Sequence, residues 1–256
     1  METEESIFSA TPQSTTKGRN WSECIALLDE TTPDILDYVY ITNYTDPTVN
    51  KEVERIASNL RQALNETVQN ITWLNDTTRK AVEKKLEELT LTIGYPEVLR
   101  NISVLEARYK YVPFFPLNIS FIEAFYHLRE GLYKMHLSKL WNHKKSSLGR
   151  DYSPRNVRPI YDLSRNTDEI PYALFASPFY QQDLPRSLNY GGIGGTIAHE
   201  LAARLFAEMK KSKIPSDRNS LDNKTSCFEK QYKSVNKKLL LENYVLCLVA
   251  ASFVWA

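Results

Sequence analysis

The feature that most constrains the fold is a stretch of helical periodicity, from residue 20 to about 145, that is almost free of glycine. In VNKEVERIASNLRQALNETV, apolar residues recur every three or four positions from Val49 to Val68, with charged residues between them. This spacing is typical of an amphipathic helix. DTTRKAVEKKLEELTLTIGYP predicts a second helix, capped by Asp76 and stopped by Gly94 and Pro96, and ISFIEAFYHLREGLYKMHLSKLW predicts a third.

The sequence pattern changes at about Ser146, where helical periodicity gives way to short β-type runs. RNVRPIYDLSRNTDEIPYALFASPFY contains two short β-type runs around an Asn-Thr-Asp turn and predicts a hairpin. LNYGGIGGTIAHELAARLFAEMKK passes from a glycine-rich turn into a helix, and residues 213–226 are expected to form a polar loop before a last helix from about Phe228. The sequence therefore predicts a disordered leader (1–18), a helical domain (19–145) and a second domain (146–256) with a small β-hairpin or sheet. The fold class is mainly α, of the α+β type.

Composition narrows the classes of function. Hydrophobic residues make up 42% of the 256 residues and charged residues 25%, which is enough for an ordinary core. The net charge of +1 gives no reason to expect nucleic acid as a partner. The longest uncharged apolar run, NYVLCLVAASFVWA, has 14 residues, too few to span a bilayer, so it predicts a buried helix, with a tail anchor as the alternative. The acidic, Ser/Thr-rich first 18 residues do not have the pattern of a signal peptide.

Asparagine usage gives different information on the compartment. The 17 Asn and 38 Ser or Thr residues predict about 2.5 N-x-S/T sequons by chance, and the chain has eight. The sequons begin at Asn20, Asn43, Asn65, Asn70, Asn75, Asn101, Asn118 and Asn223. This excess indicates an extracellular or cell-surface lineage, although the chain shows neither a signal peptide nor an anchor. The three cysteines, Cys24, Cys227 and Cys247, form no CxxC pair and are expected to be buried free thiols.

One dipeptide, His199-Glu200, is typical of a metal site. His199-Glu200 is the first half of HExxH, in which two histidines on one helix face hold zinc and the glutamate acts as general base. Ala203 stands where the second histidine belongs, and no histidine follows His199. Glu242, in LLLENYV, is a candidate third ligand. The pair by itself also fits an ordinary helix, and the glycine run before it lacks the GKS or GKT of a phosphate loop.

The surrounding sequence resembles a known family. SLNYGGIGGTIAHELA is similar to the LNYGGIGxVIGHEITHGFD segment of the neprilysin/endothelin-converting-enzyme family of zinc endopeptidases. ITWLNDTTRKAVEKKLEELTLTIGYP resembles the family's LxWMDxxTRxxAxxKLxxxxxxIGYP, and VRPIYDLSRNTDEIPYALFASPFY its VNAFYxxxxNxIxFPAGxLQxPFF. RNWSECIALL, VNKEVERIASNLRQAL and LLLENYVLCLVAASF resemble further family segments in the same order. The resemblance implies a helical domain packed on a thermolysin-like zincin domain that is truncated and degenerate.

The resemblance also assigns roles to residues. His199 and Glu242 correspond to zinc ligands and Glu200 to the general base, while the second zinc histidine falls at Ala203. Arg204 replaces a glycine and is expected to bring a positive charge near the place of the cation.

Further departures lie outside the HExxH segment. The aspartate that orients a zinc-bound histidine falls at Leu246. The edge-strand Asn-Ala pair that holds substrate falls at Arg158 and Pro159, where proline cannot donate a backbone hydrogen bond. Cys24 and Cys227 fall on disulfide positions whose partners lie in family segments that this chain does not match.

These departures predict a catalytically inactive peptidase homologue that binds zinc weakly or not at all. Three alternatives stay open: a weakly active zinc endopeptidase acting on small peptides, a peptide-binding or decoy protein, and a regulatory partner of an active homologue. A truncated gene product is a further alternative. No membrane span and no nucleic-acid partner are expected.

Overall fold

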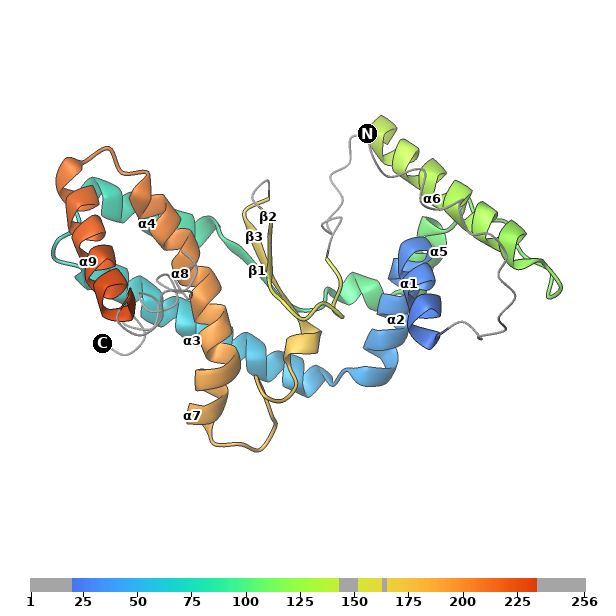
Figure 1. The fold of residues 1–256 in the computed structure, drawn as a ribbon, viewed down its shortest axis with the longest axis horizontal. Coiled ribbons are helices and arrows are strands. Elements are labelled where there is room, and N and C mark those ends of the chain that lie inside the picture. Colours follow the sequence, from blue (N-terminus) through green and yellow to red (C-terminus); the bar gives the residue numbers. More distant parts are fainter. Residues whose placement is uncertain (1–19, 143–151, 163–164, 234–256) are drawn as a thin grey trace.

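In the computed structural model, residues 20–142, 152–162 and 165–233 are described, and the predicted leader lies outside them. Helices gather at both ends of the molecule, and the long helix α3 runs between them (Figure 1). Figure 1 shows α1, α2, α5 and α6 gathered at one end and α4, α8 and α9 at the other, with the strands between them. The bounds of the helices are α1 (Trp21–Thr31), α2 (Pro33–Tyr44), α3 (Pro47–Asn70), α4 (Asp76–Glu88), α5 (Ile102–Arg108), α6 (Phe121–Asn142), α7 (Arg186–Asn189), α8 (Gly195–Lys210) and α9 (Pro215–Lys233).

The long helix α3 supplies the predicted apolar stripe. Asp46 caps its first turn, with its side chain accepting a hydrogen bond from the Thr48 backbone N–H. From Val49 to Val68 the residues on one face are buried, so the expected amphipathic helix is confirmed. The third predicted helix is likewise confirmed as α6. The mainly α class with a small sheet is therefore correct.

The sheet has the order β1-β3-β2 and comprises β1 (Thr90–Gly94), β2 (Ile160–Asp162) and β3 (Thr167–Pro171). β2 and β3 form the expected antiparallel hairpin, with Asn166 at φ 52° in its turn. β1 was not expected, because the second predicted helix was extended to Gly94. α4 instead ends at Glu88, and the run from Thr90 to Ile93, in which three of four residues are β-branched, pairs in parallel with β3.

The segment 213–226 also differs from the sequence-based expectation. From Pro215 onward it belongs to α9, and proline is a residue favoured at the first position of a helix. Asp217, 2% exposed, accepts hydrogen bonds from the Thr78 hydroxyl (2.6 Å) and the Asn75 backbone N–H (3.1 Å). Leu221 is buried as well. The polar composition of this segment reflects a solvent-facing side rather than a loop.

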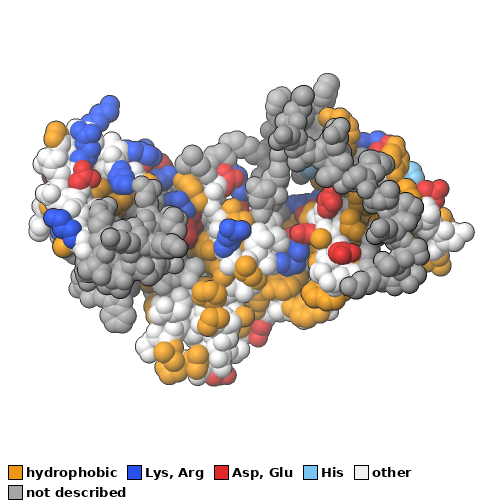
Figure 2. Space-filling view, viewed as in Figure 1, with side chains coloured by type: hydrophobic (Ala, Val, Ile, Leu, Met, Phe, Trp, Pro, Cys, Tyr) orange, Lys and Arg blue, Asp and Glu red, His pale blue; other side chains and the backbone are white. Residues whose placement is uncertain are grey.

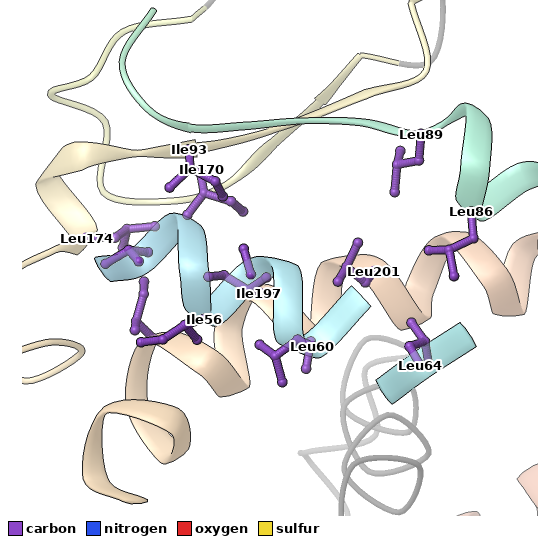
Figure 3. Packing of buried hydrophobic residues seen from close by; sticks show 14 of the residues in the cluster. Ile56, Leu60, Leu64, Leu86, Leu89, Ile93, Ile170, Leu174, Ile197 and Leu201 are labelled. Atoms are coloured by element: carbon purple, nitrogen blue, oxygen red, sulfur yellow. The ribbon is translucent and has the colours of Figure 1, made fainter. Parts of the chain in front are cut away.

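One apolar core joins elements from both parts of the chain. In Figure 3, Ile56 and Leu60 of α3 face Ile197 and Leu201 of α8, and Ile93 and Ile170 approach from the sheet. Burying one such side chain is worth about 1.5–3 kcal/mol relative to leaving it exposed. Because α8 packs against α3 and α4, its position depends on the helical part of the sequence.

The surface carries both signs of charge. Figure 2 shows hydrophobic side chains gathered along the lower edge of this face, where α7 lies. Phe179, Leu184 and Leu188 of this segment are exposed. No helix in the described part of the chain combines the length and apolarity needed to cross a bilayer.

Candidate functional site

The glycine run before α8 is a packing device. Residues Tyr190–Gly194 form a π-helical turn that continues directly into α8, rather than the expected open turn. The Ile193 backbone N–H donates to the Phe179 carbonyl (2.7 Å), and a Cβ on Gly192 would lie 2.2 Å from the same oxygen. A residue larger than glycine would force the Phe179 backbone away. The run thus sets the start of α8 through close backbone contact.

The four residues of interest share one strip of α8. Its opposite face, which includes Ile197 and Leu201, is fully buried against α3, α4 and the sheet. His199, Glu200, Ala203 and Arg204 are half-buried, at the helical spacing of one turn. The helix therefore presents His199 and Ala203 on the same strip, as an HExxH helix presents its two histidines, but Ala203 offers only a methyl group.

Arg204 is the centre of an ionic cluster that joins α8 to the hairpin. Its Nη2 donates to Oε2 of Glu200 at 2.8 Å, and its Nε donates to Oδ1 of Asp168 at 3.1 Å. The guanidinium carbon lies 3.7 Å from the ring centroid of Tyr161, a cation–π distance. One cation thus contacts α8, β3 and β2 together.

Asp168 is the most buried member of this cluster. Its side chain is 1% exposed, and its Oδ2 has no hydrogen-bond partner in the part of the chain that the structure describes. Burial raises the pKa of Asp168 to about 6, and the negative charge of Glu200 acts in the same direction. The charge and hydrogen bond of Arg204 and the charge of Lys85 only partly oppose this rise.

A second polar group flanks Arg204. Lys85 of α4 donates to the Asn166 Oδ1 and, at 3.3 Å, to the Tyr161 hydroxyl. The Tyr161 hydroxyl itself donates to the Asn166 Oδ1 at 3.2 Å. These contacts hold the Tyr161 ring, and so fix the surface on which the guanidinium stacks.

The described residues do not by themselves supply a catalytic zinc centre. Such a centre needs three protein ligands and an unobstructed general base. No group of three or more His, Cys, Asp or Glu side chains able to hold a metal occurs among residues 20–142, 152–162 and 165–233. The helix instead places an alanine at the position of the second ligand and an arginine on the carboxylate of Glu200. The expected third ligand Glu242, together with Leu246, lies outside the described residues.

The degenerate substrate positions come just before the edge strand. Arg158 is exposed and Pro159 half-buried, and both precede β2, which pairs only with β3 among the described strands. The structure thus brings His199, Glu200, Ala203 and Arg204 together on α8 and leaves Arg158 and Pro159 on the approach to the hairpin. Cys24 and Cys227 are unpaired and exposed, so the expectation of buried thiols is wrong for these two, and Cys247 lies outside the described residues.

Comparison with known sequences decides the family. Two profiles described as peptidase family M13 match the chain, one over residues 1–96 and the other over residues 159–244. The chain belongs to peptidase family M13. This confirms the resemblance to the neprilysin/endothelin-converting-enzyme family, whose members depend on zinc.

Relatives and solved structures agree with this assignment. Neprilysin-2 of Caenorhabditis elegans is 25% identical over 84% of this chain and 30% of its own length. An endothelin-converting enzyme homolog of Locusta migratoria is 30% identical over 58% of this chain and 20% of its own length. The fold resembles that of the Mycobacterium tuberculosis zinc metalloprotease ZMP1 in its open state, with a TM-score of 0.68, 16% identity and coverage of 93% of this chain and 38% of that one. The chain therefore spans less than a third of the length of neprilysin-2 and of the Locusta migratoria homolog.

Sequence reasoning missed Asp168 and Tyr161, two of the three groups that Arg204 contacts. Asp168 was assigned to the hairpin turn, whereas it lies within β3 and pairs with Leu91 of β1 and Tyr161 of β2. A signal was available, because the M13 pattern NxIxFP has isoleucine at the position of Asp168. A carboxylate at an apolar strand position requires a buried partner, and Arg204 is that partner.

Proposed function

We propose that this chain is a catalytically silent M13 peptidase homologue, a peptidase-like scaffold that neither holds a catalytic zinc nor cleaves peptides. The observation that carries the proposal is the 2.8 Å ion pair between Arg204 and Glu200, one helical turn apart. A general base must accept a proton from a metal-bound water. Here a permanent cation occupies an oxygen of that base.

The alanine at position 203 acts separately from Arg204. A zincin site uses two imidazoles from one helix and a third protein ligand. Replacing one imidazole by a methyl group removes a coordinate bond outright. Leu246 also stands where M13 peptidases have the aspartate that orients a zinc-bound histidine. Loss of such a carboxylate costs about 10–100-fold in metal affinity or activity. These losses compound, so zinc binding is expected to be weak or absent.

The test measures metal content and hydrolysis on the whole purified chain. We expect well below one zinc per chain by mass spectrometry after incubation with zinc and dialysis. We also expect no cleavage of internally quenched peptides beyond the background measured without protein, with an active M13 peptidase assayed in parallel. One zinc per chain together with chelator-sensitive cleavage would refute the proposal and establish the alternative of a weakly active endopeptidase.

A second candidate function is peptide binding without turnover. The observation that favours it is β2, whose far edge has no partner among the described strands. An extended peptide adds to such an edge through backbone hydrogen bonds. Pro159 removes one donor next to this edge, whereas exposed Arg158 supplies a positive charge beside it. The expected ligand is therefore a short peptide with an acidic group.

Fluorescence polarisation with labelled acidic and neutral peptides tests this candidate. Binding is expected to be saturable, to weaken in Arg158→Ala and to leave the peptide mass unchanged after long incubation. An exposed arginine far from β2, Arg218→Ala, is the matched control. Equal polarisation with and without the protein would exclude peptide binding at the peptide concentrations used.

The proposal extends to location, since we infer a secretory lineage from the sequons. Seven of the eight sequon asparagines are exposed, and Asn65 is half-buried. Asn75 and Asn101 cap helices through Oδ1, with bonds of 2.9 and 3.0 Å, which leaves Nδ2, the atom that carries an N-glycan, outside the cap bond. Expression through a eukaryotic secretory pathway is expected to give a mass shift that a glycosidase removes, and an unshifted secreted chain would contradict this inference.

A further inference from the structure

We propose that Asp168 and Glu200 form a cation site that the chain fills from within by Arg204. This inference rests on the proposed function, because it explains how the M13 site is held together without a metal. The ligands are two carboxylates and the face of Tyr161, a set that differs from the two imidazoles and glutamate of an M13 zinc centre.

The geometry is that of a bound cation rather than of a surface salt bridge. The guanidinium contacts one oxygen of each carboxylate, at 2.8 Å and 3.1 Å, and stacks on Tyr161 at 3.7 Å. The side chains are largely removed from water, with 20% of Arg204, 17% of Glu200 and 1% of Asp168 exposed. Planar guanidinium suits such a site, since it binds carboxylates directionally and stacks on aromatic rings.

The charge balance of the site points to a cation as its required occupant. Two carboxylates face one guanidinium, and Lys85, a further cation that acts on Asp168, hydrogen-bonds Asn166 and Tyr161 instead. The second oxygen of Asp168, Oδ2, has no hydrogen-bond partner among the described residues, although the side chain is almost fully buried. Without Arg204, the buried carboxylate of Asp168 and the half-buried carboxylate of Glu200 would lie together unpaired, which is strongly destabilising.

The two ends of the contact depart from the M13 pattern in complementary ways. Arg204 stands where HEITHG has glycine, and Asp168 stands where NxIxFP has isoleucine. A buried aspartate opposite glycine would leave its charge uncompensated, and an arginine opposite isoleucine would keep only Glu200 as its carboxylate partner in this cluster. The pair together forms a closed contact between α8 and β3, and it does so at any metal concentration.

The test replaces the internal cation by an external one. Arg204→Ala leaves both carboxylates and opens space between them, and Mn²⁺, which prefers carboxylate oxygen, is the probe. We expect Arg204→Ala to lower the Tm by roughly 5 °C or more, since breaking a buried pair is costly. Millimolar Mn²⁺ is expected to recover at least half of that loss, to leave the wild-type Tm unchanged and to leave Arg204→Ala/Asp168→Asn unchanged.

Two further variants keep the proposal falsifiable. Arg204→Lys retains a cation and is expected to lose less than half as much Tm as Arg204→Ala. If Arg204→Ala does not fold, Arg204→Ala/Asp168→Asn is expected to fold, because it removes the unpaired buried charge. Failure of that double variant, or an Mn²⁺ shift that is absent or equal with and without Asp168, would overturn the cation site. Zinc content and peptide cleavage by the wild-type chain test the proposed function independently.

Discussion

Replacing Asp168 by asparagine is expected to change how stability depends on pH. The pKa of Asp168 is raised to about 6 from an ordinary value of 3.8, mainly by burial. A carboxyl group with a raised pKa favours the folded state when protonated. Its contribution is fully present below pH 3.8 and is lost as the pH rises through about 6. Asparagine keeps the shape and an acceptor for Arg204 but has no proton to lose.

The size of the effect follows from this shift. At 1.36 kcal/mol for each unit of pKa, complete ionisation of Asp168 costs about 3 kcal/mol of unfolding free energy, of which about 2 kcal/mol falls between pH 4.5 and 7.5. The 1% exposure of the side chain means that solvent screening reduces this little. The gap in stability between Asp168→Asn and wild type is therefore expected to move by about 2 kcal/mol in favour of the variant over that interval.

Urea unfolding followed by tryptophan fluorescence at pH 4.5, 5.5, 6.5 and 7.5 measures this gap. The matched control is Asp183→Asn, at an exposed position where the positive φ of 67° suits asparagine as well as aspartate. Its gap from wild type is expected to stay constant with pH. A gap for Asp168→Asn that changes by less than about 0.5 kcal/mol, or in the opposite sense, would refute the assigned burial cost.

Three further predictions concern the core, a buried polar contact and the metal site. Leu201→Ala, at a fully buried position of α8, is expected to cost about 2–5 kcal/mol in chemical denaturation, while Leu188→Ala, 58% exposed, changes stability little. Asp217→Ala leaves a buried hydroxyl and a backbone N–H without their acceptor and is expected to cost about 2 kcal/mol or more, against a near-neutral Asp222→Ala in the same helix. Ala203→His alone is expected not to reach one zinc per chain by mass spectrometry, because the positive charge of Arg204 remains beside the site and Leu246 supplies no carboxylate to orient a zinc-bound histidine; full zinc occupancy would show that these two departures are no barrier.

The elements that sequence patterning predicted well are those whose burial is local. The stripe of α3 could be identified because each of its buried residues lies three or four positions from the next. β1 could not, because the run from Thr90 to Gly94 becomes a strand only by pairing with β3, far along the chain. The first part of α9 was missed for a similar reason, since Asp217 is typical of a polar loop until its acceptor role at the start of α4 is known.

The residues of the site that lie close together in the sequence could be predicted, and their partners from distant segments could not. The resemblance to M13 peptidases located His199, Glu200, Ala203 and the positive charge of Arg204 from contiguous sequence. It did not identify the residues that receive that charge. Asp168 pairs with Arg204 only because the hairpin register places it inside β3, whereas the predicted turn included it. A shift of one residue in a strand exchanges its two faces, so a turn prediction cannot decide this contact.

Ala203 and Arg204 have different effects on α8, and this difference explains how His199 and Glu200 can lie on an intact helix. A methyl group at position 203 only removes a ligand, and α8 needs nothing in its place, because its opposite face is held by Ile197 and Leu201. Arg204 adds a contact that requires Glu200, which therefore stabilises the helix as an ion-pair partner. Asp168 in turn requires Arg204, since a buried carboxylate without a cation destabilises the sheet. Glu200 is thus fixed by its neighbours even where no metal or substrate acts on it.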